Sequence, residues 1–290
     1  MFKSIITTFG ILIFLLGFSV NITSAGEIST SKGYFELREN FENPASCWPT
    51  SSGYANISNC SNWGVYGQIQ LSQKRAFSGS NSAMITYTAN ETSGQLQRSL
   101  TAFSPTGYST FYANFYMYFE PGFVFPADNK TLQVLREYDF QPMLAVSNFS
   151  QKVLDSAEDL RVYENGPNPY DYSIDTGFTI TTGRWYHIEV EYVLDTIPPP
   201  NSNGIVRIWI DGTLKTQRTN VPIRATSSGQ IEGFNFGINY SNGCCGGWKA
   251  TGPIYKYFDD IYVAAGYTGP APRIIPDNKP PAPPTGLRIQ

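Results

Sequence analysis

The sequence has a single histidine, His187, and only four cysteines among its 290 residues. The cysteines form no Cys-x-x-Cys motif, and one histidine cannot supply the mixed His and Cys ligand sets of common zinc sites. Charged residues are also scarce, at 15% of the chain, and the formal net charge is -3. A weakly acidic chain with few Lys and Arg has no electrostatic reason to bind nucleic acid or anionic membranes. We therefore expect no zinc site and no nucleic-acid partner, and the charge provides no long-range attraction toward acidic polysaccharides.

Long apolar runs are missing after Val20. Before that point, Lys3 precedes an almost wholly apolar stretch over residues 5–20, and small residues up to Ala25 offer a cleavage site. This order predicts a signal peptide over residues 1–25. A membrane anchor is the alternative, but Thr and Gly dilute a run that is near the lower length limit for a span. We expect a secreted protein, extracellular or periplasmic, that is monomeric and has no membrane span after cleavage.

Convincing helical patterns are scarce as well, and only residues 153–160 show helical spacing, in a stretch that can equally be a loop. Strand-like runs with turn residues between them recur instead, and the clearest covers residues 110–119. Many short strands at this spacing are typical of a sandwich or jelly roll. We predict an all-β jelly-roll sandwich of two antiparallel sheets over residues 26–268. Its strands are expected at 35–41, 67–71, 83–87, 110–119, 131–140, 143–149, 172–181, 183–192, 204–215, 234–240 and 255–264.

The strand pair between Gly183 and Lys215 gives the strongest signal. Its apolar residues alternate with polar or bulky ones, and a period of two indicates half-buried antiparallel strands. Asp211-Gly212 tolerates the positive φ that a tight hairpin turn needs. The alternation places five side chains on the face opposite the core: Trp185, His187, Glu189, Arg207 and Trp209.

This Trp-rich pair, with its hydrophobic alternation followed by Asp-Gly, resembles the concanavalin A-like (laminin G-type) jelly roll. The closing run Tyr257-Phe258-Asp259-Asp260-Ile261-Tyr262-Val263 and the opening Asn40-Phe41-Glu42 are similar to the last and first strands of a group of secreted jelly-roll proteins. That group is related to polysaccharide lyases and includes heparin lyase I-like and alginate and glucuronan lyase-like proteins. The resemblance implies a concanavalin A-like fold and a polysaccharide or glycan as the partner.

The resemblance also implies that the first and last strands lie side by side, where a structural calcium can bind in such folds. Glu42, Asp259 and Asp260 are the carboxylates at hand, and calcium takes several oxygen ligands. In the alternative interpretation one Asp caps a turn and the other bonds to the backbone. We expect no other cofactor to be required.

A jelly-roll glycoside hydrolase of the laminarinase type is disfavoured. Enzymes of that type carry Glu, Asp and Glu at alternate positions, and the similar run in this chain has Glu137, Asp139 and Gln141. Retaining hydrolysis needs two carboxyl groups, one of them protonated at the right moment. Gln141 cannot exchange a proton, so the acid/base of that reaction is missing.

A polysaccharide lyase has different needs, because it must neutralise a uronate carboxylate, remove the adjacent proton and protonate the leaving oxygen. Arg, Gln or Asn can perform the first task, and Tyr or His the other two. The candidate catalytic residues are Gln133, Arg136, His187 and Tyr116, and a lyase predicts that they share one concave wall. Each also has an ordinary explanation as a polar or aromatic residue on a sheet face.

A glycan-binding or adhesion module without catalysis is the other hypothesis. Aromatic rings stack on the apolar faces of sugars, and amides bond to their hydroxyls. The candidate carbohydrate-binding residues are Trp209, Trp185, Tyr112, Asn114, Tyr118 and Trp248. Aromatic-rich sandwich cores provide an ordinary explanation for several of these rings.

The cysteines Cys47, Cys60, Cys244 and Cys245 are expected to form disulfides in an exported chain. Three pairings are possible, and the sequence does not choose between them. Pairing of Cys47 with Cys60 leaves the adjacent Cys244 and Cys245 as a vicinal disulfide or as free thiols. Cross-pairing between the two regions is the alternative.

Proline, alanine, glycine and asparagine dominate residues 269–290. The run Pro280-Pro281-Ala282-Pro283-Pro284 and the residues after it resemble the linker and first strand that open fibronectin type III domains. We predict a Pro-rich linker or tail over residues 269–290, and the start of a truncated second domain is the alternative.

Overall fold

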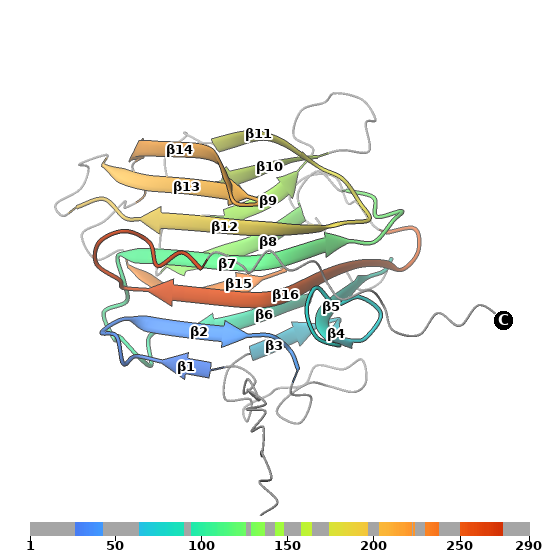
Figure 1. The fold of residues 1–290 in the computed structure, drawn as a ribbon, viewed down its shortest axis with the longest axis horizontal. Helices are drawn as coiled ribbons and strands as arrows, with labels where there is room; N and C mark the ends of the chain where they lie inside the picture. Colours follow the sequence, from blue (N-terminus) through green and yellow to red (C-terminus); the bar gives the residue numbers. More distant parts are fainter. Residues whose placement is uncertain are drawn as a thin grey trace, which may run out of the picture.

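The computed structural model describes residues 27–42, 64–89, 94–125, 129–136, 143–147, 158–163, 174–196, 203–221, 223, 230–237 and 250–274. The regular elements of these residues are all β-strands, and they form two antiparallel sheets that pack face to face (Figure 1). The predicted all-β jelly-roll sandwich is confirmed.

Sheet A has nine strands. They are β1 (Glu27–Ser29), β2 (Phe35–Glu39), β4 (Ile69–Ser72), β5 (Ser82–Tyr87), β7 (Thr110–Phe119), β12 (Trp185–Val193), β13 (Gly204–Ile210), β14 (Thr213–Val221) and β16 (Ile254–Ala265). Its main order is β1-β2-β16-β7-β12-β13-β14, and β5 and β4 continue from β16. The opening strand of the prediction, now β2, therefore lies beside the last strand β16, as the resemblance implied, with Leu37 opposite Val263.

Sheet B has seven strands in the order β11-β10-β9-β8-β15-β6-β3. They are β3 (Gly64–Gly67), β6 (Gly94–Ser99), β8 (Asn129–Arg136), β9 (Met143–Ser147), β10 (Glu158–Tyr163), β11 (Ile174–Ile180) and β15 (Ile231–Phe236).

The core lies between the two sheets, because successive side chains of a strand point to opposite faces. Phe111 and Phe115 of β7 point inward and meet Phe234 and Phe236 of β15, with ring centroids 5.5 and 5.0 Å apart. All four rings are fully buried. Burial of such large aromatic side chains supplies much of the stability of a sandwich.

Alternation on the central strands of sheet A leaves the other side chains on its outer face. His187 lies opposite Tyr116, and Glu189 lies opposite both Asn114 of β7 and Trp209 of β13. Paired residues of an antiparallel sheet are close neighbours on one face. The predicted polar and aromatic row of the strand pair is therefore present.

Asp211 and Gly212 form the turn between β13 and β14, with φ angles of 51° and 75°. Both are in the left-handed region that a tight hairpin turn requires, as predicted. Asp211 also accepts hydrogen bonds from Arg184 Nη2 (2.6 Å) and from the backbone N–H of His187 (3.1 Å).

Several elements differ from the predictions. The single strand expected at 67–71 is divided after Gly67 (φ 70°) into β3 and β4, which belong to different sheets. The short polar strands β6 and β10 were not predicted, and β10 begins inside the stretch with helical spacing. The strand after the Asp211-Gly212 turn was predicted to end at Lys215, but β14 continues to Val221. Its residues are mostly exposed and show no apolar alternation.

Candidate functional site

The outer face of sheet A brings together the predicted side chains Tyr112, Asn114, Tyr116, Tyr118, Trp185, His187 and Trp209. All except the half-buried Trp185 are less than one-tenth exposed. This low exposure differs from the expectation of an open glycan-facing wall. Two segments of the chain itself cover the face, one before β5 and one after β16.

His187 and Asn114 form the central polar contact of this face, with 2.9 Å between Nε2 and Oδ1. The Asn114 amide nitrogen donates to the carbonyl of Ile274 at 2.8 Å, so Oδ1 faces the imidazole as an acceptor. His187 must then carry its proton on Nε2 when neutral. Burial lowers the pKa of His187, against the opposing effect of the Glu189 and Asp211 carboxylates. The neutral imidazole is therefore the stable form at neutral pH.

Tyr116 lies beside His187, with 5.0 Å between the ring centroids. Its other side stacks on Phe77 at 3.4 Å, and Phe77 also meets Trp185 edge-on at 6.1 Å. Burial raises the pKa of the Tyr116 hydroxyl, which keeps it protonated at neutral pH. The loop before β5 thus covers the two candidate proton-transfer groups of this face.

Glu189 is the second polar centre of the outer face of sheet A, and it is 1% exposed. Arg273 donates to both of its carboxylate oxygens at 2.7 Å, and Tyr112 donates to Oε2 at 2.7 Å. Burial alone would raise the pKa of Glu189, but these donors outweigh it and hold the pKa below its ordinary value. The Arg273 guanidinium also lies over the Trp209 ring, 4.6 Å from its centroid. Trp209 therefore contacts the chain's own arginine.

Gln133 and Arg136 do not join this group, because β8 belongs to sheet B. The expectation that they share one wall with His187 and Tyr116 is wrong. The chain crosses from sheet A to sheet B between β7 and β8, and alternation within a strand cannot reveal such a crossing. Gln133 lies on the outer face of sheet B, because its neighbours Leu132 and Val134 point into the core.

A row of amides crosses the outer face of sheet B. Asn235 of β15 is paired with Gln97 of β6 on one side and with Gln133 of β8 on the other. Asn235 and Gln133 are buried, and Gln97 is half-buried. The Asn235 Oδ1 atom is buried without a hydrogen-bond partner in the described structure. Buried polar atoms normally have a partner, so this acceptor marks a position suited to a ligand donor.

Only Gln133 of this amide row was predicted as a site residue. Asn235 could have been found from the alternation over residues 234–240, which places its side chain on the face of the strand away from the buried phenylalanines. Gln97 lies in β6, which carried too few apolar residues to be predicted as a strand. The row itself depends on which strands are neighbours, and that is a property of the tertiary structure.

The predicted carboxylates Glu42, Asp259 and Asp260 all contact the loop of residues 77–81. Asp259 accepts backbone N–H groups from Phe77 and Ser78, and Asp260 accepts the Ser78 hydroxyl. Glu42 Oε1 accepts the N–H groups of Ser80 and Asn81 at 2.8 and 2.7 Å. Within the described ranges, no three His, Cys, Asp or Glu side chains are arranged as a metal site.

Asp259 is fully buried, and burial together with the neighbouring Asp260 carboxylate raises its pKa to about 8. Asp259 has no exposed surface and both of its oxygens accept N–H groups, so it does not fit as a calcium ligand, whereas Glu42 is partly exposed. Asp260 has a raised pKa because of burial and the nearby Glu42 carboxylate. A cation between Asp260 and Glu42 would relieve that repulsion, so these two residues fit as carboxylate ligands.

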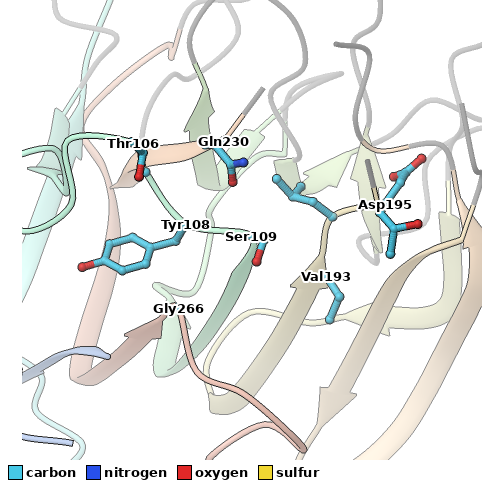
Figure 2. Close-up of a pocket in the computed structure, with 10 residues that line it drawn as sticks. Thr106, Tyr108, Ser109, Val193, Asp195, Gln230 and Gly266 are labelled. Atoms are coloured by element: carbon cyan, nitrogen blue, oxygen red, sulfur yellow. The ribbon is translucent and has the colours of Figure 1, made fainter. Parts of the chain in front are cut away.

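A cavity of about 580 Å³ opens at the end of the sandwich where β7 begins and β12 ends (Figure 2). Its polar lining residues are Thr106, Tyr108, Ser109, Asp195, Thr196 and Gln230. Asp195 Oδ1 accepts the N–H of Ile223 at 2.7 Å. None of the predicted site residues lines the cavity, and its lining includes no Arg, Lys or His.

Comparison with known families and structures agrees with this fold. Residues 147–261, from the end of β9 into β16, match the model of the polysaccharide lyase 14 family. No curated protein matches the chain in sequence. The structure is similar to the marine PL-14 alginate lyase from Aplysia kurodai, with a TM-score of 0.57 and 16% identity over 77% of this chain and 98% of that one.

Two further solved structures are similar. Alginate lyase Aly36B has a TM-score of 0.56 and 16% identity over 79% of this chain and 96% of its own. Alginate lyase vAL-1 from Chlorella virus has a TM-score of 0.52 and 12% identity over 78% of this chain and 100% of its own. At such identities these matches show the fold. The chain therefore shares the jelly-roll fold of these alginate lyases.

The match to the polysaccharide lyase 14 model agrees with the similarity to polysaccharide-lyase-related proteins that the opening and closing strands had indicated. Among its described residues, no helix is long and apolar enough to cross a bilayer. Other predictions concern residues outside the described ones. These are the signal peptide over 1–25, the hydrolase comparison at Glu137, Asp139 and Gln141, the cysteines Cys47, Cys60, Cys244 and Cys245, Trp248, and the tail after residue 274.

Proposed function

We propose that this jelly roll is a secreted polysaccharide lyase that cleaves a uronate-containing glycan by β-elimination on the outer face of sheet B. The match of residues 147–261 to the polysaccharide lyase 14 family carries the proposal. The similar solved structures are named as alginate lyases, and alginate is a polymer of uronates.

The amide row Gln97, Asn235 and Gln133 supplies groups for binding a uronate. Side-chain amides donate N–H groups to a carboxylate and accept hydrogen bonds from sugar hydroxyls. Such donors withdraw charge from the carboxylate and so acidify the adjacent C–H. The unpaired Oδ1 of Asn235 suits a sugar hydroxyl at the centre of the row. We assign Gln133 to the substrate carboxylate, in the role that its residue type suggested.

Elimination removes the proton beside the carboxylate, forms a C=C bond, and breaks the C–O bond to the leaving sugar, whose oxygen takes up a proton. The sole histidine lies on the opposite side of the sandwich, so we propose a tyrosine for proton transfer.

A glycan-binding module without catalysis is the alternative, and one observation favours it. His187, the only histidine, is buried on sheet A beneath Phe77 and Tyr116. A binder needs only amides and rings, whereas a lyase also needs a proton-transfer group in reach of the amide row.

The test is to incubate the mature protein with alginate, glucuronan and heparin-type polymers and follow the ultraviolet absorbance of the new C=C bond. An increase in absorbance that Gln133→Ala abolishes supports the lyase and the assignment of Gln133. Retention on one polymer without product supports the binding module. If the protein forms no product and is retained on none of these polymers, both functions are contradicted.

We further propose a structural calcium held by Asp260 and Glu42, and secretion directed by the signal peptide over residues 1–25. The calcium would neutralise the Asp260–Glu42 repulsion and stabilise the loop of residues 77–81, with no part in the elimination. Secretion is tested by N-terminal sequencing of the exported protein, which should begin at Gly26.

A further inference from the structure

The segment after β16 turns back across the outer face of sheet A (Figure 1). The turn begins at Gly266, which has a φ of 83° and whose N–H donates to the carbonyl of Thr110 at 3.0 Å. A Cβ atom at position 266 would clash with the ring of Tyr108. Both the positive φ and the close approach require glycine, so the chain is committed to this reversal.

Tyr267 provides the first anchor of the returning segment. It is 4% exposed, its hydroxyl donates to Glu191 Oε1 at 2.8 Å, and its carbonyl accepts the Thr110 hydroxyl at 3.0 Å. Glu191 is in turn paired with Arg207. The anchor therefore joins the segment to β7 and β12 and, through Arg207, to β13.

Arg273 provides the second anchor, through its two hydrogen bonds to Glu189 and its position over the Trp209 ring. The Glu189 side chain is 2% exposed and that of Arg273 is 34% exposed. A buried carboxylate that loses its cationic partner is strongly destabilising, because its desolvation is no longer compensated. The Asn114 amide bond to the carbonyl of Ile274 then fixes the chain one residue further on.

We propose that residues 266–274 are a latch, and that the outer face of sheet A is a built-in peptide-binding face whose ligand is this latch. Trp209 and Tyr112, two of the predicted sugar-binding rings, contact the latch instead, together with the carboxylates Glu189 and Glu191. The jelly-roll domain thus extends to residue 274, beyond the boundary expected at residue 268.

The latch has a consequence for the arrangement of the protein. Residue 274 is held over the centre of sheet A, so the Pro-rich sequence that follows starts from the side opposite the amide row of sheet B. Sheet A then holds the latch, and the amide row of sheet B lies on the opposite face of the sandwich.

The test compares Arg273→Ala with Arg184→Ala in the mature full-length protein. Arg184 is a matched control, because it also pairs with a carboxylate, Asp211, and lies over a ring, Tyr186, but the side chains of its ion pair are about half exposed. We expect Arg273→Ala to lower the Tm by roughly 6–12 °C, and Arg184→Ala by no more than about 3 °C. Arg273→Lys, which retains the charge but loses the bidentate geometry, should fall between them and remain folded.

Limited digestion with chymotrypsin gives a second readout, because Tyr267 is a cleavage site that the latch buries. Arg273→Ala or Arg273→Lys should increase cleavage after Tyr267 at least tenfold, as measured by mass spectrometry, and Arg184→Ala should not. Equal Tm losses and equal cleavage in the Arg273 and Arg184 variants would overturn the latch. A gain in retention on neutral or acidic glycans in Arg273→Ala would also overturn it, because the face would then be a masked sugar site. These readouts do not measure catalytic activity, so they test the latch independently of the proposed lyase function.

Discussion

His187 Nε2 lies 2.9 Å from Asn114 Oδ1, and the Asn114 amide is itself held by the carbonyl of Ile274. The contact links β12, β7 and the latch in one buried chain of hydrogen bonds. A histidine held in this way, with its Nε2 proton already donated, is a structural element of sheet A. We therefore expect protonation of His187 to affect the stability of the fold.

The pH dependence of stability tests the state of His187. Its pKa in the folded protein is lowered by burial, so below the unfolded-state value of about 6.5 the unfolded chain binds a proton that the folded chain does not. This contribution is fully present above that pH and is lost as the pH falls. The unfolding free energy should fall between pH 7 and pH 5, and in His187→Gln this fall should be smaller by about 1 kcal/mol, measured by urea denaturation at each pH. An unchanged slope would contradict a buried neutral imidazole.

The amide row predicts a strong dependence of glycan handling on Gln133. Gln133→Glu keeps the size of the side chain but places a negative charge against the substrate carboxylate, so kcat/KM should fall at least about 100-fold, or retention should be lost in a binding module. Gln70→Ala is the control, since Gln70 is an exposed amide of β4 in the other sheet. It should leave kcat/KM and retention within about twofold. Equal effects of the two variants would exclude the outer face of sheet B as the site.

Asp260→Asn tests the repulsion of the Asp260 carboxylate by those of Asp259 and Glu42, beside the loop of residues 77–81. Asp260 has a φ of 44°, which Asn tolerates well, and the change removes a charge beside the buried Asp259. The raised pKa of Asp259, about 8, means that its stabilising protonated form is lost as the pH rises above the unfolded value toward 8 and beyond. In EDTA at pH 9, Asp260→Asn should therefore be more stable than the unmodified protein by about 1 kcal/mol, measured by thermal denaturation.

Calcium addition completes this test. Millimolar calcium should raise the Tm of the unmodified protein and have little effect on Asp260→Asn. Asp211→Asn is the matched control, because Asp211 also has a positive φ but lies in the exposed β13–β14 turn. It should keep the calcium response. The absence of any calcium response in the unmodified protein would refute the proposed site.

Lys256 is fully buried between the sheets, where Nζ donates to the Thr131 hydroxyl at 2.9 Å and lies 5.2 and 5.1 Å from the ring centroids of Phe119 and Phe258. Burial holds its pKa well below the ordinary value. The unfolded chain then binds a proton that the folded one releases, so this group costs stability at every pH below about 10, and increasingly as the pH falls. Lys256→Met should raise the unfolding free energy at pH 6 by about 1–3 kcal/mol, measured by urea denaturation. A loss of stability would show that the ammonium form is retained in the core.

Alternation in the sequence was enough to predict the sandwich, the faces of β7 and β12, and the turn at Asp211-Gly212. It also brought Asn114, His187, Glu189 and Trp209 to one face, because period two in a strand is a local property. Strands with little apolar alternation, such as β6 and β14, were missed for the same reason.

The sequence by itself therefore determined the fold class, the inward and outward faces of the long strands, and the family resemblance. Only the tertiary structure decided which strands are neighbours and what covers each face. It separated Gln133 from His187 by placing β8 in sheet B, and it aligned Gln133 with Asn235 and Gln97. It also laid Arg273, in a segment expected to be a tail, over Glu189 and Trp209. Strand pairing and chain reversal join residues far apart in the sequence, and no local periodicity records them.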